Sequence, residues 1–178
     1  MEALPHFPLF RDPVKEQSFK ESDEECECCG RSRGWIYSRS IYVSQGDGDI
    51  SICPWCIADG SASAKFDGTF QSAGIHPYGK NLLSPEDVEL VEKRTPGFVT
   101  WQDHGWMMCC GIACEYIGEA RAEDLRGRWA AAVPSIFSDD SWSEKEIEEL
   151  VSRMGTDPAA YVFECRKCGK LLGFWDCS

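Results

Sequence analysis

The hydrophobic pattern predicts one amphipathic helix with particular clarity. It begins at Ser143, which can form a capping box with Glu146. Apolar residues then recur at the spacing of one helical face, at Ile147, Leu150, Val151 and Met154. We expect this face to pack against the core of the protein. A groove for a partner helix is the alternative interpretation.

Local signals predict three further helices. Ser84 has the chemistry of an N-cap, Pro85 suits the first helical position, and a helix should run from there to about Arg94. A second helix is expected over 122–132. A short helix over 61–66 can continue the chain after Cys56.

Strands are predicted where aromatic and β-branched residues gather. Residues 35–43 should form a hairpin with 50–52 across the glycine-rich turn 46–49. Strands are also expected within 98–118, and a C-terminal hairpin should pair 161–163 with 171–175. The opening residues should form an ordered strap, because they carry four apolar anchors: Phe7, Leu9, Phe10 and Phe19.

These elements predict an α+β fold, a small mixed structure of helices and short strands. The chain has 178 residues, and 43% of them are hydrophobic, which is enough for a real core. We divide it into an N-terminal region over 1–83 and a helical and strand region over 84–178. We expect the two to form one compact unit.

The charge of the chain narrows its possible partners. The formal net charge is -12, and ten of these negative charges come from two stretches, 16–27 and 139–149. Such acidity disfavours nucleic acid, whose affinity for proteins depends on Lys and Arg. The sequence also lacks a signal peptide pattern and a long apolar run, so we expect a cytoplasmic protein without membrane insertion. With nucleic acid and membrane disfavoured, we expect the partner to be another protein.

Eleven cysteines supply the strongest chemical signal, and eight of them form four closely spaced pairs. Each gap is two or three residues, which lets both thiolates bind one metal ion. The pairs are Cys26/Cys29, Cys53/Cys56, Cys110/Cys114 and Cys165/Cys168. In a reducing compartment such pairs are metal ligands more often than disulfides.

The first two pairs predict a zinc ribbon. Gly30 follows Cys29, and the expected hairpin leads from this pair to Cys53 and Cys56. The last two pairs predict a second four-cysteine site closed by the C-terminal hairpin. There Cys109 can replace Cys110 as a ligand. The other cysteines, Cys28, Cys109 and Cys177, are most simply non-ligands.

Two structural zinc ions are therefore expected, although the sequence leaves iron open as the metal. Four thiolates leave no coordination position for a catalytic water, so zinc hydrolase chemistry is disfavoured. Three sources of enzymatic activity stay open as alternatives: a redox pair at Cys53/Cys56, a reactive thiol at Cys28, and the neighbouring side chains of Asp103 and His104.

The cysteine motifs also carry a family resemblance. The string from Cys26 to Tyr37, the string from Cys53 to Ala62 and the segment from Arg94 to Phe98 resemble the CbrC family of bacterial proteins. The family is named for a colicin-tolerance protein, which implies a link to the cell envelope or to stress. This sequence has Cys109 where relatives have histidine, which affects the ligand set of the second site.

We therefore predict a non-enzymatic, zinc-stabilised interaction or regulatory protein. Its binding surface would combine exposed aromatic side chains with acidic segments. A thiol-redox protein or other enzyme is the second possibility, and a metal-dependent nucleic-acid binder is the third.

Overall fold

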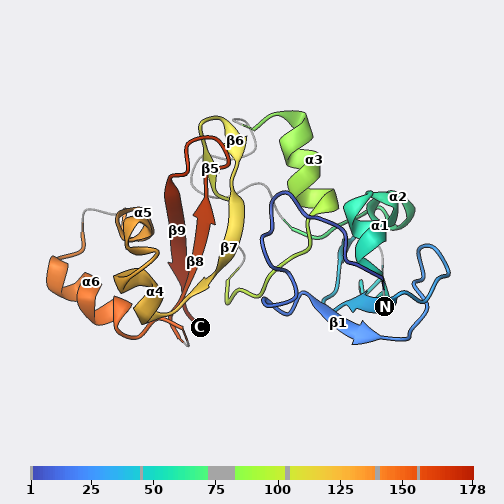
Figure 1. Cartoon of the computed structure of the whole chain (residues 1–178), viewed down its shortest axis with the longest axis horizontal. Coiled ribbons are helices and arrows are strands. Elements are labelled where there is room, and N and C mark those ends of the chain that lie inside the picture. Colours follow the sequence, from blue (N-terminus) through green and yellow to red (C-terminus); the bar gives the residue numbers. More distant parts are fainter. Residues whose placement is uncertain (1, 45, 72–82, 103–104, 139–140, 156) are drawn as a thin grey trace.

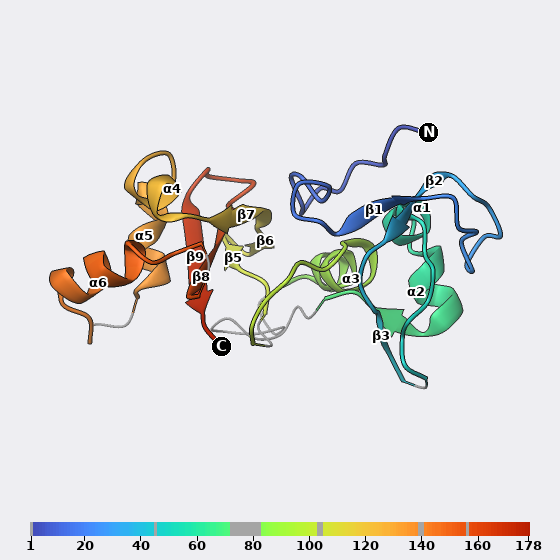
Figure 2. The ribbon, with the colours of Figure 1, turned by 90° about the horizontal axis from the view of Figure 1, so that it is seen from below.

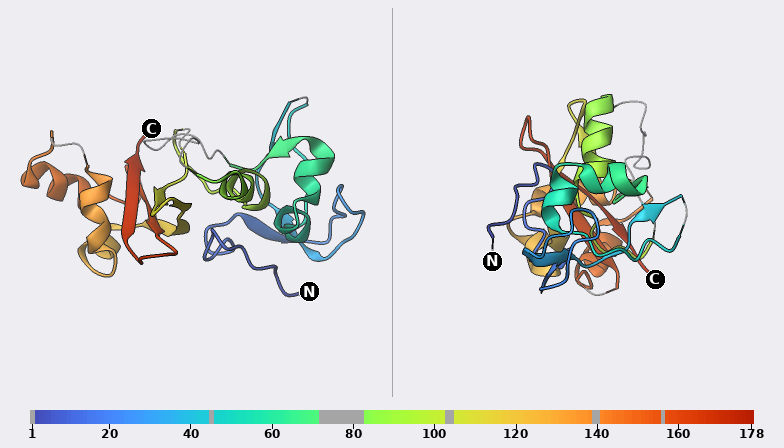
Figure 3. Two further views of the ribbon diagram at one scale, coloured as in Figure 1. Left: turned by 90° about the horizontal axis from the view of Figure 1, so that it is seen from above. Right: turned by 90° about the vertical axis from the view of Figure 1, so that its right-hand side faces the viewer.

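The computed structural model describes residues 2–44, 46–71, 83–102, 105–138, 141–155 and 157–178. The protein is elongated, with a three-stranded sheet near its middle (Figures 1 and 3). Helices α4, α5 and α6 lie on one side of this sheet, and the N-terminal half of the chain lies on the other (Figure 1). The fold is a mixture of helices and strands, as the sequence predicted.

The central sheet is antiparallel in the order β7-β8-β9. It consists of β7 (Glu115–Ala120), β8 (Ala159–Glu164) and β9 (Leu171–Asp176). The predicted C-terminal hairpin is therefore confirmed as β8 and β9. Side chains of β8 alternate between two cores, with Tyr161 and Phe163 on the N-terminal side and Val162 on the helical side. The middle strand is thus buried on both faces.

Short helices cover the second face of the sheet. These are α4 (Ala122–Arg126), a 3-10 turn (Ala130–Ala132), α5 (Val133–Ile136) and α6 (Glu144–Val151). The expectation of one helix over 122–132 is corrected, because Gly127 interrupts it with φ and ψ of -120° and -114°. The predicted capping box of α6 is present, with Ser143 and Glu146 bonding reciprocally.

The N-terminal half contains two small ribbons and two short helices. Strand β1 (Phe19–Ser22) pairs with β2 (Gly34–Tyr37), and β3 (Tyr42–Val43) pairs with β4 (Gly68–Thr69). The helices are α1 (Pro54–Ala58) and α2 (Ser61–Phe66). The predicted hairpin of 35–43 with 50–52 is therefore corrected, because β2 pairs with the opening segment instead. Residues 50–52 return as irregular chain, held to β2 by the Tyr37 N–H donating to the Ile52 carbonyl.

Helix α3 (Pro85–Arg94) connects the two halves. Its N-cap is Ser84, whose hydroxyl accepts the N–H of Asp87, as predicted. The helix lies between the α1–α2 pair and the hairpin formed by β5 (Met108–Cys109) and β6 (Ile112–Ala113) (Figures 1 and 2). It therefore contacts one cysteine-bearing segment of each half, α1 with Cys56 and the β5–β6 hairpin with Cys109 and Cys110.

The opening strap is ordered and buried, as predicted. Its four apolar anchors are each less than 5% exposed. The strap extends the edge of the central sheet, because the Tyr116 N–H donates to Leu9 and the Arg11 N–H donates to Tyr116. The ring of Phe98 stacks on Tyr116 with 4.0 Å between centroids.

Within the described ranges, every helix is too short or too polar to cross a membrane.

Candidate metal centres

The first cysteine cluster contains the four residues that the sequence predicted. The sulfurs of Cys26, Cys29, Cys53 and Cys56 all lie within 4.8 Å of one another. The Sγ–Sγ distance is 3.9 Å from Cys26 to Cys56 and from Cys29 to Cys53, and 3.6 Å from Cys53 to Cys56. Cys29 is exposed, whereas the other three are buried.

Local backbone structure holds these sulfurs together. In the first pair, the Cys26 N–H donates to the Arg31 carbonyl and the Gly30 N–H donates to the Cys26 carbonyl. Gly30 has φ of +67°, which a side chain would disfavour. In the second pair, Cys53 is the N-cap of α1, and its N–H donates to the Cys26 sulfur at 3.2 Å. A tight knuckle and a helix start therefore face each other.

The second cluster joins the β5–β6 hairpin to the β8–β9 hairpin. Its sulfurs belong to Cys109, Cys110, Cys165 and Cys168 and also lie within 4.8 Å of one another. The sulfur of Cys109 lies 3.8 Å from those of Cys110 and Cys168. Only Cys165 is buried, so this cluster is more open to solvent than the first.

The knuckle between β8 and β9 repeats the hydrogen bonds of the first one. The Cys165 N–H donates to the Lys170 carbonyl, and the Gly169 N–H donates to the Cys165 carbonyl. Gly169 has φ of +71°, close to the value at Gly30. Two segments far apart in the sequence thus adopt the same metal-knuckle conformation, because both place a glycine after the second cysteine.

The predicted place of Cys114 in the second cluster is corrected, because Cys109 lies there instead. Cys110 and Gly111 form the two-residue turn of the β5–β6 hairpin, with φ of +53° and +74°. Cys114 follows the hairpin and is fully buried, and its carbonyl accepts the indole N–H of Trp106. Cys110 followed by Gly111 between two short apolar runs is a sequence signal for a hairpin turn. This signal could have placed Cys109 on the strand before the turn, and so in the cluster.

The geometry of both clusters fits a tetrahedral metal ion. Zinc–sulfur bonds of about 2.3 Å place the sulfurs of a tetrahedron about 3.8 Å apart. The five Sγ–Sγ distances given above range from 3.6 to 3.9 Å, and every sulfur of a cluster lies within 4.8 Å of the others. The donor set of thiols alone suits zinc or iron. Each cluster could therefore hold one such ion.

Backbone amides favour ionised sulfur at the first cysteine of each knuckle. Burial opposes ionisation of Cys26, yet N–H groups of Cys53, Cys29 and Cys28 lower its pKa. Burial likewise opposes ionisation of Cys165, and N–H groups of the following turn lower its pKa to about 6. Thiolate is the form that binds a metal, so these backbone amides favour ligation at Cys26 and Cys165.

Two basic side chains attach the knuckles to the rest of the protein. Lys65 donates its ammonium to the carbonyls of Glu27 and Cys28, at 2.6 and 3.0 Å. Arg166 donates from Nε to the Ala113 carbonyl and from its terminal nitrogen to Asp87 of α3, both at 2.9 Å. Lys65 thus connects the first knuckle to α2, and Arg166 connects the second knuckle to α3 and β6.

The remaining candidate residues lie outside both clusters or outside the described residues. Cys28 is partly buried, and its sulfur lies 3.6 Å from the hydroxyl of Ser61. Cys177 is also partly buried and belongs to neither cluster. Asp103 and His104 fall outside the residues that the structure describes.

Comparison with known proteins places the chain in one family. A family profile described as an uncharacterised protein family (UPF0167) matches residues 4–177. A UPF0167 protein of Pseudomonas aeruginosa is 36% identical over 169 residues, which cover 94% of this chain and 93% of the relative. A UPF0167 protein of Mycobacterium bovis and one of Mycobacterium tuberculosis are each 33% identical over 180 residues, which cover 98% of this chain and 94% of each relative. No solved structure matches the chain. The chain therefore belongs to the UPF0167 family.

Proposed function

We propose that this protein is a non-enzymatic interaction or regulatory protein whose fold depends on two structural zinc ions. The observation that carries the proposal is the convergence of four sulfurs at each of two clusters. Their ligands are Cys26, Cys29, Cys53 and Cys56 at the first, and Cys109, Cys110, Cys165 and Cys168 at the second. Four thiolates complete a tetrahedral zinc site, which leaves no position for substrate or water.

The positions of the clusters support a structural role. The first ties the knuckle at Cys26 to helix α1, and the second ties the β5–β6 hairpin to the central sheet. A bound zinc ion would therefore cross-link segments far apart in the sequence. Structural zinc can contribute on the order of 10–16 kcal/mol of apparent binding free energy, which is comparable to the net stability of a domain.

A protein partner is proposed from the exposed side chains. Most aromatic residues are buried, but Tyr42 and Trp101 are 63% and 54% exposed, and Val99 is 57% exposed. Large exposed apolar side chains of this kind occur at protein interaction sites. The net charge of -12 favours a partner with basic groups and disfavours nucleic acid. A role in the cytoplasm, in envelope stress or in colicin tolerance rests on the sequence and on the CbrC resemblance.

The main alternative is a thiol-redox protein that uses Cys53 and Cys56. Their sulfurs are 3.6 Å apart, which is near enough to form a disulfide after a small movement. However, Cys53 is fully buried, whereas reactive redox cysteines lie in partly exposed surroundings. Both sulfurs also face a second cysteine pair, which a redox motif does not require.

Metal analysis of the purified protein distinguishes these functions. We expect about two zinc ions per chain, and few thiols that react with a colorimetric reagent until a chelator is added. Iron in place of zinc would change the metal but keep the structural role. A metal-free protein with a Cys53–Cys56 disulfide that cycles with thioredoxin would contradict the proposal. Affinity capture from bacterial cells, with a chelated sample as the control, would then test the interaction role.

A further inference from the structure

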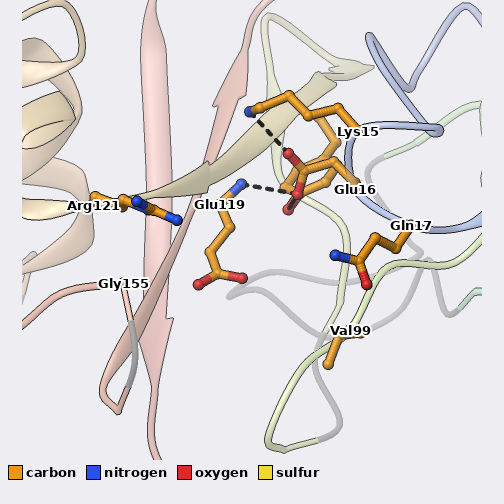
Figure 4. Close-up of a pocket in the computed structure, with 8 residues that line it drawn as sticks. Lys15, Glu16, Gln17, Val99, Glu119, Arg121 and Gly155 are labelled. Atoms are coloured by element: carbon orange, nitrogen blue, oxygen red, sulfur yellow. Dashed lines mark hydrogen bonds and ion pairs between the residues drawn. The ribbon is translucent and has the colours of Figure 1, made fainter.

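A polar cavity of about 330 Å³ lies away from both cysteine clusters, where the strap meets the edge of the central sheet (Figure 4). The strap contributes Lys15, Glu16 and Gln17 to its wall. Strand β7 and the residue after it contribute Glu119 and Arg121. This volume is at the lower end of the range for small-molecule sites in proteins, so a ligand of few atoms would fill it.

Glu16 is a structural part of the cavity wall. Its carboxylate accepts the hydroxyl of Tyr116 at 3.1 Å and the N–H of Glu119 at 3.2 Å, and it pairs with Lys15 at 3.2 Å. The carboxylate thereby satisfies an N–H group on the outer edge of β7. Gly118 leaves room for it, because a Cβ there would lie 2.8 Å from a Glu16 oxygen. Because these three donors already pair with the Glu16 carboxylate, we do not assign Glu16 to a ligand.

Glu119 and Arg121 differ from Glu16, because neither side chain forms an ion pair among the described residues. They lie two positions apart in an extended segment, so both project to the same side. Figure 4 shows both side chains at the cavity, with Gln17 across from them. Glu119 is partly buried, and burial together with the nearby Glu16 raises its pKa. The positive charges of Arg121 and Lys15 oppose this shift, although neither forms an ion pair with the Glu119 carboxylate among the described residues.

The backbone of the cavity wall also departs from ordinary conformations. Gln17 has φ of +56°, which is uncommon for a residue other than glycine. Gly155 has φ of +104°, and a Cβ there would lie 2.8 Å from the side chain of Arg121. The glycine thus lets the Arg121 stem lie against the backbone. Backbone strain of the kind seen at Gln17 clusters at ligand-binding sites in proteins.

The charges of the cavity select among ligand classes. A metal ion would meet one available carboxylate, at Glu119, and the positive charge of Arg121 nearby. A phosphate would meet Arg121 but be repelled by Glu119 and Glu16. A molecule with a cationic and an anionic group a few ångströms apart can satisfy both free side chains at once.

We propose that this cavity binds a small zwitterion of the α-amino acid class. Its ammonium group pairs with Glu119, and its carboxylate pairs with the guanidinium of Arg121. The Gln17 amide and Val99 lie at the same cavity and contact the remainder of the ligand. This site is separate from the cysteine clusters. Ligand binding there would let a small molecule regulate the interaction role proposed above.

The test measures thermal unfolding of the zinc-loaded full chain with each of the twenty L-amino acids in turn. We expect at least one to raise the melting temperature by about 5 °C at one hundred times its Kd. Calorimetry then measures its Kd. The analogue lacking the carboxylate and the analogue lacking the amine should each bind at least tenfold more weakly.

Four variants locate the site. Glu119→Gln and Arg121→Gln should each weaken binding at least tenfold, and the controls Glu123→Gln and Lys145→Gln, on exposed helical positions, should leave it unchanged. Unchanged zinc content in every variant verifies that the chain is folded. The proposal is overturned if no L-amino acid changes the melting temperature, if the two cavity variants bind like the parent, or if inorganic phosphate or Ca²⁺ alone binds instead.

Discussion

Cys109 and Cys114 carry the same thiol on opposite sides of one hairpin, but their surroundings differ. Cys109 lies at the end of β5, where its sulfur faces Cys110 and Cys168. Cys114 is fully buried among apolar residues beyond the turn. Burial raises the pKa of both thiols, so their burial and position, and not their pKa, separate them. Backbone geometry therefore decides which of the two thiols reaches the cluster.

Substitution of these two cysteines should have different effects on metal content. Cys109→Ser is expected to remove one of two zinc ions, because serine is a poor zinc ligand. Cys114→Ala should retain both ions and cost about 1–2 kcal/mol of stability through the small cavity it leaves. Elemental analysis with denaturant unfolding measures both effects, and Cys177→Ser serves as the control. Loss of zinc in Cys114→Ala alone would assign the ligand to Cys114.

The raised pKa of Glu119 predicts how pH acts on stability. Burial and the charges of Glu16 and Asp176 raise it, while Arg121 and Lys15 oppose the shift. The folded state then holds this proton more tightly than the unfolded state, so stability falls as pH rises from the ordinary carboxyl range through the raised pKa.

Glu119→Gln should remove this contribution. The variant is expected to be more stable than the parent protein at pH 7, and the difference should shrink as pH falls through the raised pKa to the ordinary carboxyl range. Urea unfolding at a series of pH values measures it, with Glu123→Gln as the exposed control. A variant less stable than the parent at pH 7 would mean that the Glu119 carboxylate stabilises the fold.

At the scale of elements, local chemistry explains what the sequence could predict. The N-caps Ser84 and Ser143 act within one turn of their own helices, and both were identified from neighbouring residues alone. Pairing of β1 with β2 depends on segments more than ten residues apart, and nothing in the strap marks its partner. The misplacement of Cys114 in the second cluster has a local cause, because the Cys110-Gly111 turn places Cys109, which the sequence offered only as an alternative to Cys110, beside the other sulfurs.

Arg166 predicts a stability effect that is separate from metal binding. It lies inside the Cys165–Cys168 loop and contacts both Asp87 on α3 and the Ala113 carbonyl on β6. Arg166→Gln should lower the free energy of unfolding by about 1–3 kcal/mol, because these hydrogen bonds involve a charged group.

The matched control is Lys167→Gln, an exposed position in the same loop. It should change the free energy of unfolding by less than about 0.5 kcal/mol. Both variants are expected to bind two zinc ions, as measured by elemental analysis. Equal stability of the two variants would show that the Arg166 contacts add nothing to the fold.

For the whole molecule, the two clusters differ in their access to solvent. Three of the four cysteines are buried at the first cluster, and only Cys165 is buried at the second. A chelator must reach the ligands to compete for the metal, so the more exposed cluster should release its ion first.

Release of zinc to a chromogenic chelator should therefore occur in two phases of equal amplitude. The fast phase should disappear in Cys168→Ser and persist in Cys29→Ser, since these residues belong to different clusters. Stopped-flow absorbance measures both phases. A fast phase that disappears in Cys29→Ser would reverse the order.

Because β8 is buried on both faces, exposing it when zinc is scarce would favour aggregation. The strand reads Ala-Ala-Tyr-Val-Phe-Glu, and its first five residues are buried. Cys165 follows it directly, so loss of an ion from the second cluster would remove the link between this end of β8 and the β5–β6 hairpin and make local opening of the sheet easier. An uncovered segment of this composition, apolar and rich in β-forming side chains, readily pairs with copies of itself. Zinc deprivation is therefore expected to deplete the protein through aggregation, and the supply of metal would set how much of it stays in solution.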